Sequence, residues 1–446
     1  MAIKMRNRTA LTRRAVMKST VATAACTAIG GIAYPSLSFA PGRPQITHGI
    51  QSGDVSADSG VIWARADRPA RMLVEVATTD TFRDIRRAVF VDALPESDFT
   101  AKALLDDLPP GQDIFYRISF QDLSSAVFGE SKVGHFRTAP ADRRSISFVW
   151  SGDTMGQGWG IDLARGGMRS YAAMHRNAPD FFIHCGDNIY ADCPIAATRK
   201  LPDGTLWRSV VTEEKSKPAE TLADYRGNYK YNLLDGNLRA FNAAVPTIAL
   251  WDNHEVMETW WPGEPLSGKP VDESNTLIFA ARARRAFHEF LPVRESLTEP
   301  GRVYRKLGYG PLLDLFMLDM RSYRGPDGPH DDRVYRLTAD LHYTAAHYYD
   351  PNRAAFQDFE PFWEFVSGPL HAGTWTAVTL ERTFGPQVAF HKAASATQGD
   401  NLAPCYGLQF FGQAMIDGAT GALTVTLKDV EDRALWSITL DPASTD

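Results

Sequence analysis

The sequence predicts an α/β protein preceded by a small all-β domain, and three observations lead to that fold class. The chain has 446 residues, enough for two domains with a sizeable core. From Ser145 onward, short apolar runs alternate with helical stretches, the pattern of a βα sheet protein. Between Ile46 and Ala139, short apolar runs follow one another at the spacing of a β-sandwich. We therefore expect a β-sandwich over residues 41–142 and an α/β domain over residues 143–446.

The first 40 residues have the three parts of an export signal. A basic region with Arg13 and Arg14 precedes an Ala-rich apolar run, and Ser38-Phe39-Ala40 offers a cleavage site. The paired arginines are typical of a signal read by the twin-arginine export machinery, and an ordinary secretory signal is the alternative. The apolar run is too short to span a bilayer, so no stable membrane anchor is expected. The mature protein should begin near Pro41 and be periplasmic or secreted.

The predicted β domain consists of short strands separated by turn residues. Leu108-Pro109-Pro110-Gly111 resembles the loop that leads into a late strand of fibronectin-like or Ig-like modules, and Pro140 marks the exit. No group of reactive residues stands out here, so a packing or gating role is expected. The strands are predicted at Val61–Arg65, Met72–Val76, Thr100–Leu104, Phe115–Phe120 and Phe136–Ala139.

In the α/β domain, buried strands and helices are predicted in alternation, followed by a β tail. The strands are expected at Ile146–Trp150, Asp180–Cys185, Val245–Trp251, Leu312–Asp319 and Val334–Leu337. Helices are expected at Gly167–Asn177, Tyr225–Asn242 and Thr276–Leu291, and the tail strands at Leu408–Phe411 and Leu423–Leu427. Such an alternation places catalytic loops at the carboxyl ends of the strands.

Polar side chains follow these strands, at the edge where the carboxyl ends of parallel strands meet. They are Asp153, Asp187, Asn253 with His254, and Asp340 with His342. Carboxylates, an amide oxygen and imidazoles suit divalent or ferric ions. A shared carboxylate can bridge two ions about 3.5–4 Å apart, as in two-metal phosphoester hydrolysis. A lone Gly-Asp after a strand is more often a turn, and a lone Asp-Asn-His-Glu is ambiguous, but the ordered set predicts a metal site.

The net charge of the chain bears on whether it binds nucleic acid. The formal net charge is −6, and the first 40 residues hold six basic and no acidic residues, so the mature chain would carry −12. An acidic protein of this kind is not expected to bind nucleic acid specifically.

Three cysteines remain after the signal, an odd count that excludes a framework in which every cysteine is in a disulfide. Cys185 and Cys193 could form a bridge, or Cys185 could be a buried free thiol.

Four motifs make the sequence similar to the PhoD-type alkaline phosphatases and phosphodiesterases, a branch of the calcineurin-like metallophosphoesterases. They are Gly186–Asp192 (GDNIYAD), Trp251–Glu255 (WDNHE), Leu318–Arg324 (LDMRSYR) and Thr338–His342 (TADLH). The resemblance covers nearly the whole chain, including the signal and His48–Asp54 (HGIQSGD) near the start of the β domain. It implies that the α/β domain is an αββα metallophosphoesterase sandwich with a binuclear metal centre.

The resemblance also implies a role for each site residue. Asp153 would bind one metal, Asp187 would bridge both, and Tyr190 would ligate a ferric ion, although it could instead pack in the core. Asn253 and His342 would complete the second ion or position phosphate. His254 would ligate or act beside the leaving group. Arg321 would orient the phosphate with a bidentate contact, although it could instead pair with Asp319 or Asp327.

The implied activity is hydrolysis of a phosphate monoester or diester at alkaline pH, with metal-activated water attacking phosphorus in line. Ca²⁺ and Fe³⁺ are the implied ions, with Mn²⁺ or Zn²⁺ as alternatives. The implied partners are a phosphate ester substrate and the twin-arginine export machinery, and a monomer is expected.

The sequence departs from the family pattern at three motifs and in one segment. Asp153 is followed by Thr154 and lacks the His that many calcineurin-like enzymes carry two positions after this Asp. Asn253 stands where family members often have Asp. Asp340 stands where they usually have the first His of a Gly-His-x-His motif. Family members carry a long crossover between the LDMR and TADLH motifs, but here only a short polar loop at about 325–333 connects them. In family members that crossover includes a strand and two helices, and their loss would expose apolar core residues to water. The alternative function is therefore a catalytically impaired remnant that binds metal or phosphate without turnover.

Overall fold

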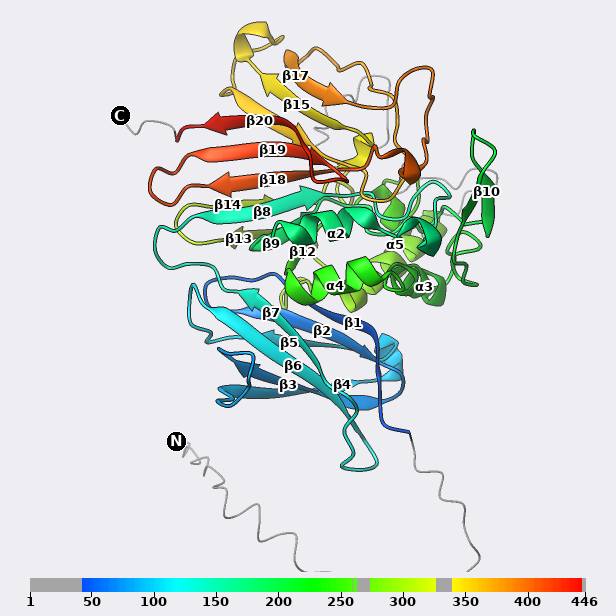
Figure 1. Ribbon diagram of the computed structural model, residues 1–446, viewed down its shortest axis with the longest axis vertical. Coiled ribbons are helices and arrows are strands. Elements are labelled where there is room, and N and C mark those ends of the chain that lie inside the picture. The colour runs from blue at the N-terminus through cyan, green and yellow to red at the C-terminus, as the bar shows by residue number, and fades with distance from the viewer. Residues whose placement is uncertain (1–41, 259, 263–272, 326–338, 443–446) are drawn as a thin grey trace, which may run out of the picture. The chain divides into compact units, whose positions relative to one another are not determined.

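The computed structural model describes residues 42–258, 260–262, 273–325 and 339–442. The described residues from Arg43 onward form one compact unit (Figure 1). The predicted export signal lies outside the described residues, as do the strand predicted at Val334–Leu337 and most of the abridged loop. Within the described part of the chain, no helix is both long enough and apolar enough to cross a membrane.

The N-terminal part is built from β-strands packed around a core of their own. A four-stranded sheet has the order β4-β3-β6-β7, from β3 (Ala70–Ala77), β4 (Arg87–Ala93), β6 (Asp113–Asp122) and β7 (Lys132–Arg137). Facing it are β1 (Ile46–Gly53), β2 (Gly60–Ala66) and β5 (Thr100–Leu105). Ile62, Met72, Val74, Ile118 and Phe120 are completely buried in the core that these strands share. The predicted all-β domain is confirmed, although β1 and β4 were not predicted and β7 begins before the predicted Phe136–Ala139.

A nine-stranded sheet runs through the molecule in the order β20-β19-β18-β8-β9-β12-β1-β2-β5. Its central strands β8 (Ile146–Ser151), β9 (Phe181–His184) and β12 (Thr247–Ala249) are parallel, as predicted. The tail strands β18 (Phe410–Ile416), β19 (Leu423–Asp429) and β20 (Ala434–Leu440) extend one side in antiparallel order. Gly53 of β1 pairs with Thr247 of β12, so the N-terminal strands join the sheet that carries the site.

In the described segments, four helices cover one face of this sheet: α2 (Arg169–Arg176), α3 (Leu222–Asn232), α4 (Gly236–Ala244) and α5 (Glu273–Phe290). They bury a core that includes Tyr171, Tyr225, Phe241 and Phe287. The helical stretch predicted around Tyr225 to Asn242 is found, but it is divided into α3 and α4. The division lies at Asp235, whose carboxylate accepts from Leu238 N at 3.0 Å and caps the second helix.

The opposite face packs against two smaller sheets (Figure 1). One is a hairpin of β13 (Arg305–Gly308) and β14 (Asp314–Met317), and the other has the order β16-β15-β17, from β15 (Thr344–Tyr349), β16 (Phe362–Val366) and β17 (Pro386–Lys392). Leu312–Asp319 was predicted as a fourth strand of the parallel sheet. This was wrong, because β14 pairs antiparallel with β13. No α-helical residue belongs to the cores under these two sheets in the described part of the chain.

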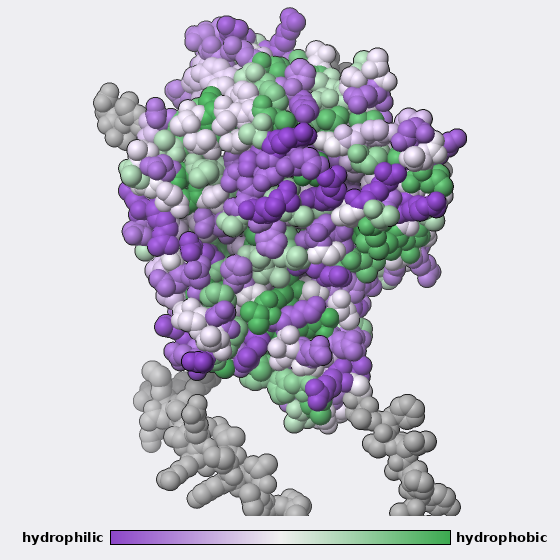
Figure 2. Space-filling view, viewed as in Figure 1, coloured by the Kyte–Doolittle hydropathy of each residue, from purple (hydrophilic) through white to green (hydrophobic). Residues whose placement is uncertain are grey.

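The remaining elements are short. A hairpin of β10 (Thr198–Lys200) and β11 (Leu206–Arg208) projects from the loop after β9. The 3₁₀ turns are η1 (Pro95–Ser97), η2 (Leu163–Arg165), η3 (Asn253–Glu255), η4 (Ala339–Leu341), η5 (Pro351–Arg353) and η6 (Pro404–Tyr406). Cys185, Cys193 and Cys405 are free, so the possible Cys185–Cys193 bridge is not formed. On the face seen in Figure 2, hydrophobic residues form small patches among hydrophilic ones, as expected of a surface in contact with water.

Candidate metal centre

The first two predicted ligands stand directly after neighbouring parallel strands. Asp153 follows β8 and Asp187 follows β9, and both are fully buried. Both have positive φ angles, 61° and 52°, a conformation that non-glycine residues rarely adopt and that clusters at functional sites. One carboxylate oxygen of each has no hydrogen-bond partner. Two buried carboxylates are therefore brought to the same sheet edge with acceptor capacity left unused.

His342 joins these two carboxylates from the strand β15 side. Its Nε2 atom lies 3.6 Å from Asp153 Oδ1, and ligand atoms of Asp153, Asp187 and His342 all lie within 4.8 Å of one another. The Nδ1 position donates to the carbonyl oxygen of Gly373 at 2.6 Å, which leaves the lone pair of Nε2 directed at the cluster. Burial lowers the pKa of His342 to about 4, so the imidazole is held in its neutral, ligating form.

Tyr190 is the fourth predicted ligand and it is completely buried. Its hydroxyl donates to His342 Nε2 at 2.8 Å and lies 3.4 Å from Asp153 Oδ1. Its ring stacks on His254 with the centroids 4.2 Å apart. The alternatives of packing and ligation are thus not exclusive, because the ring packs while the hydroxyl reaches the cluster.

Asn253 and His254 lie in η3, after β12, as the strand-end argument predicted. The backbone N–H of His254 donates to Asp187 Oδ1 at 3.1 Å, which ties the two loops together. The imidazole Nδ1 of His254 is 2.7 Å from Asp192 Oδ1. Burial acts to lower the pKa of His254, but Asp187 and Asp192 raise it well above its usual value.

Arg321 reaches the same site from the loop after β14 and is 6% exposed. Its Nε pairs with Asp252 Oδ1, its Nη2 donates to Asn253 Oδ1 at 3.1 Å, and Nη2 lies 3.8 Å from Asp340 Oδ2. Burial opposes the charge, but Asp252 raises the pKa of Arg321 further, so it stays a cation. The suggested side-chain pairing of Arg321 with Asp319 is replaced by pairing with Asp252, while Asp327 lies outside the described residues.

Glu255 was not singled out in the sequence, yet it organises the two loops that carry the ligands. Its buried carboxylate accepts from Asp187 N at 3.1 Å, Asn188 N at 2.5 Å and Asp252 N at 2.6 Å. Burial raises the pKa of Glu255 to about 7. The WDNHE spacing contained this signal, because a Glu three residues after an Asp is the pattern of a capping box.

The charges of this cluster fit a bound cation. Burial, followed by the charge of Asp340, raises the pKa of Asp153, and burial likewise raises the pKa of Asp187. A second group of carboxylates, Asp187, Asp252 and Asp340, also lies within 4.8 Å and shares Asp187 with the first group. Buried carboxylates with unused oxygens beside a neutral imidazole are the donors that hard and borderline cations prefer. The residues therefore fit a metal centre with Asp187 as the shared ligand.

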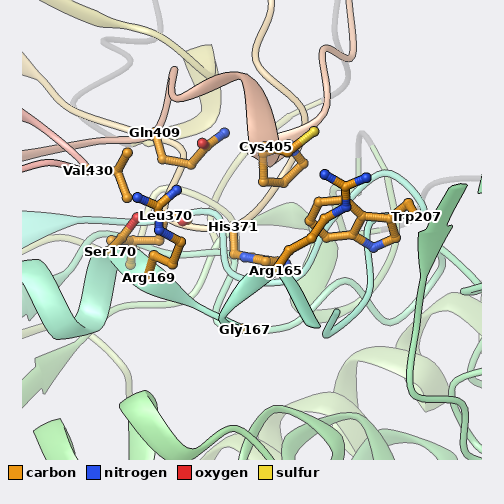
Figure 3. Close-up of a pocket in the computed structure, with 11 residues that line it drawn as sticks. Arg165, Gly167, Arg169, Ser170, Trp207, Leu370, His371, Cys405, Gln409 and Val430 are labelled. Carbon is orange, nitrogen blue, oxygen red and sulfur yellow. Dashed lines mark hydrogen bonds between the residues drawn. The ribbon is translucent and has the colours of Figure 1, made fainter. Parts of the chain in front are cut away.

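A pocket of about 270 Å³ opens onto this cluster. Asn253, His254, Arg321 and His342 line it together with Gln157, Glu258, Arg324, Asp340, Leu341, Trp375 and Val378. A separate pocket of about 230 Å³ lies between η2, α2 and η6 (Figure 3). It is lined by Arg165, Arg169, His371 and Gln409 among others and contains none of the seven predicted site residues. Four of the seven predicted site residues therefore line the pocket of about 270 Å³, and none lines the other pocket.

Comparisons with family models give the same architecture. A model described as PhoD-like phosphatase matches residues 148–334 and 330–427, which together exceed half of the chain. A model of the N-terminal domain of PhoD-like phosphatases matches residues 32–140. The N-terminal match covers the strands β1–β7, and the PhoD-like phosphatase match includes β9, β12 and most of β8, the strands that lead into the candidate metal centre.

Individual relatives agree with these models. Alkaline phosphatase D of Bacillus subtilis is 28% identical over 313 residues, which are 67% of this chain and 50% of that protein, so the chain spans about half the length of this curated relative. A solved structure of PhoD has a TM-score of 0.66 at 19% identity and covers 89% of each chain. Purple acid phosphatase PPD1 from yellow lupin (Lupinus luteus) seeds has a TM-score of 0.51 at 12% identity, covering 90% of this chain and 74% of that one. These two structural matches show the fold alone, and it is the predicted metallophosphoesterase fold.

Proposed function

The chain belongs to the PhoD-like phosphatase family, and from this premise we propose that it is an exported, metal-dependent hydrolase of phosphate monoesters or diesters. The observation that carries the proposal is the convergence of ligand atoms of Asp153, Asp187 and His342 within 4.8 Å, with one carboxylate oxygen of each aspartate left without a hydrogen-bond partner. Asp187, Asp252 and Asp340 form a second group around the shared Asp187. Asn253 lies beside this group.

Each site residue has a proposed task in binding or proton transfer. Asp153, Asp187, Tyr190, Asn253 and His342 would hold the ions. When bound, such ions lower the pKa of water and stabilise charge on phosphoryl oxygens. Arg321, already oriented by Asp252 and Asn253, would hold the phosphate oxygens. His254, oriented by Asp192, would hold a proton at Nε2 beside the leaving group.

The proposed ions are Ca²⁺ and Fe³⁺, with Mn²⁺ or Zn²⁺ as alternatives. The phenol oxygen of Tyr190 and the carboxylates are hard donors, which favour calcium and ferric ions over softer metals. Burial raises the pKa of Tyr190 well above its usual value, so a highly charged ion would be needed to deprotonate it. Metal analysis of the purified protein decides among these ions.

The proposal is tested by hydrolysis of a phosphate monoester and a phosphate diester with each of the four ions added. We expect turnover that depends on metal and disappears on chelation. Lack of turnover with every ion and both ester classes would count against the enzyme assignment. The ratio of monoester to diester rates identifies the preferred ester class.

A catalytically impaired remnant is the second candidate, and two observations favour it. The family match breaks into two pieces at the polar loop that replaces the usual crossover. Among the residues that the structure describes, the second sheet layer consists of two separate sheets, β13–β14 and β16-β15-β17. Bound metal at full stoichiometry without turnover would support the remnant. Metal-dependent turnover would eliminate it.

Export through the twin-arginine machinery to the periplasm or the medium, and a monomeric state, complete the proposal. The motif in the first 40 residues supports the export route. N-terminal sequencing should find the mature chain starting near Pro41, and retention of Met1 would reject cleavage. Light scattering of the purified protein should give the mass of one chain.

A further inference from the structure

The pocket beside the candidate metal centre has apolar lining residues that the proposed chemistry does not use. They are Leu341, Trp375 and Val378, whereas His254 and Arg321 belong to the polar part of the lining. Trp375 and Val378 are 40% and 50% exposed, and Leu341 is buried beneath the surface. An indole ring and two aliphatic side chains therefore face the same space as the groups proposed to hold phosphate.

The backbone fixes Trp375 firmly at this position. Its N–H donates to the carbonyl oxygen of His342 at 3.1 Å, and its carbonyl oxygen accepts from Ala394 N at 3.0 Å. The next residue, Thr376, donates from its N–H to Asp400 Oδ1 at 2.9 Å. The indole meets the His342 ring edge to face, with centroids 6.2 Å apart. The ring is thus placed next to a proposed metal ligand before any substrate arrives.

We propose that Trp375, Val378 and Leu341 form a subsite for the ester group of the substrate and that it takes an aromatic or heteroaromatic ring. This inference rests on the proposed function and specifies its substrate class. If the candidate metal centre and Arg321 hold the phosphoryl group, the ester substituent occupies the remaining space of the pocket of about 270 Å³. That space suits one ring system, since typical small-molecule pockets begin at about 300 Å³.

An aromatic substituent fits this apolar lining better than an alkyl one. An exposed indole face stacks on a flat ring and gains both buried area and a favourable ring contact. In the reaction, a water oxygen forms the new P–O bond and the P–O bond to the aryl oxygen breaks. The released phenol carries away one water proton, and the other passes to solvent or remains on phosphate.

Steady-state kinetics with matched esters test the subsite. We compare 4-nitrophenyl phosphate with propyl phosphate in the metal-loaded wild type, Trp375→Ala, Trp375→Phe and Phe316→Ala. Phe316 is 66% exposed on β14 and does not line the pocket, so it is the matched control. Loss of a stacking face should lower kcat/KM for the aryl ester about tenfold, mainly through KM. The alkyl ester should change less than about twofold, and Trp375→Phe should recover most of the aryl rate.

A binding measurement separates failure of the subsite from failure of the proposed function. Calorimetry should show phenylphosphonate binding more tightly than propylphosphonate to the wild type, with the preference lost in Trp375→Ala. If the wild type hydrolyses neither ester but still binds phenylphosphonate more tightly than propylphosphonate, the proposed enzyme activity is refuted and the subsite is supported. Equal losses for aryl and alkyl ligands in Trp375→Ala, or no loss for either, would overturn the subsite.

Discussion

At the scale of single residues, side chains and backbone groups outside the predicted set orient the residues proposed to bind metal or move protons. Gly373 fixes the tautomer of His342, and Asp192 holds the ring of His254. Asp192 stands in the GDNIYAD motif and was not assigned a role from the sequence. A loop aspartate is usually a solvated turn residue, and only the fold brings this one within 2.7 Å of the imidazole.

Replacement of Asp192 tests the orientation of His254. Asp192→Asn keeps the shape but removes the charge from the contact, so we expect kcat to fall about 10–100-fold, the usual effect of losing an orienting partner. KM, metal content and the unfolding temperature should change little. Asp203→Asn, at an exposed position, is the control and should leave kcat unchanged. A fall in metal content that matches the fall in kcat would show a structural role instead.

At the scale of elements, the predicted parallel strands β8, β9 and β12 were found and their carboxyl ends do meet. Their apolar runs end abruptly in polar residues, which is a strong local signal. The second layer could not be predicted in this way. Strand β15 reads TAAHYY, a run without clear alternation, and its burial comes from partners far along the chain. Leu312–Asp319 has the composition of a buried strand, but pairing partner and direction are tertiary properties.

Glu255 links two of these elements, because it joins the loop after β9 to the loop after β12. In Glu255→Ala, three buried backbone N–H groups each lose the carboxylate that accepts their hydrogen bond. We expect a loss of about 3 kcal/mol or more in the free energy of unfolding and weaker metal binding. Urea unfolding of the metal-free protein measures the first effect. Glu130→Ala, at an exposed loop position, should have no effect, and equal stability of the two variants would contradict the role of Glu255.

At the scale of the whole molecule, the N-terminal strands are fastened to the sheet that carries the site. At the end of β1, Asp54 Oδ1 pairs with Arg305 Nη2 at 2.6 Å, and the two side chains are 0% and 9% exposed. Asp54 Oδ2 also accepts from Arg294 N at 2.7 Å. The sequence placed Asp54 in the HGIQSGD motif but gave no partner for it, because the two arginines lie more than 200 positions away.

Breaking the buried Asp54–Arg305 pair should destabilise the contact between the N-terminal strands and the rest of the molecule. Asp54→Ala leaves the Arg305 charge buried without its carboxylate, which we expect to lower the free energy of unfolding by about 3–5 kcal/mol. Asp92→Ala breaks the Arg71–Asp92 pair, whose side chains are 48% and 40% exposed, and should not change stability measurably. Chemical denaturation of the three proteins measures the difference. Similar behaviour of both variants would show that Asp54 does not fasten the two parts.

We propose that Asp187 is shared by two metal ions that drive ester hydrolysis. Elemental analysis of the wild type and Asp187→Asn, combined with turnover of the same samples, tests this role of Asp187 most directly. We predict about two ions per chain in the wild type, and in the variant fewer ions with at least about a hundredfold lower kcat. An unchanged metal content and rate in Asp187→Asn, with the exposed Asp203→Asn as reference, would contradict the claim.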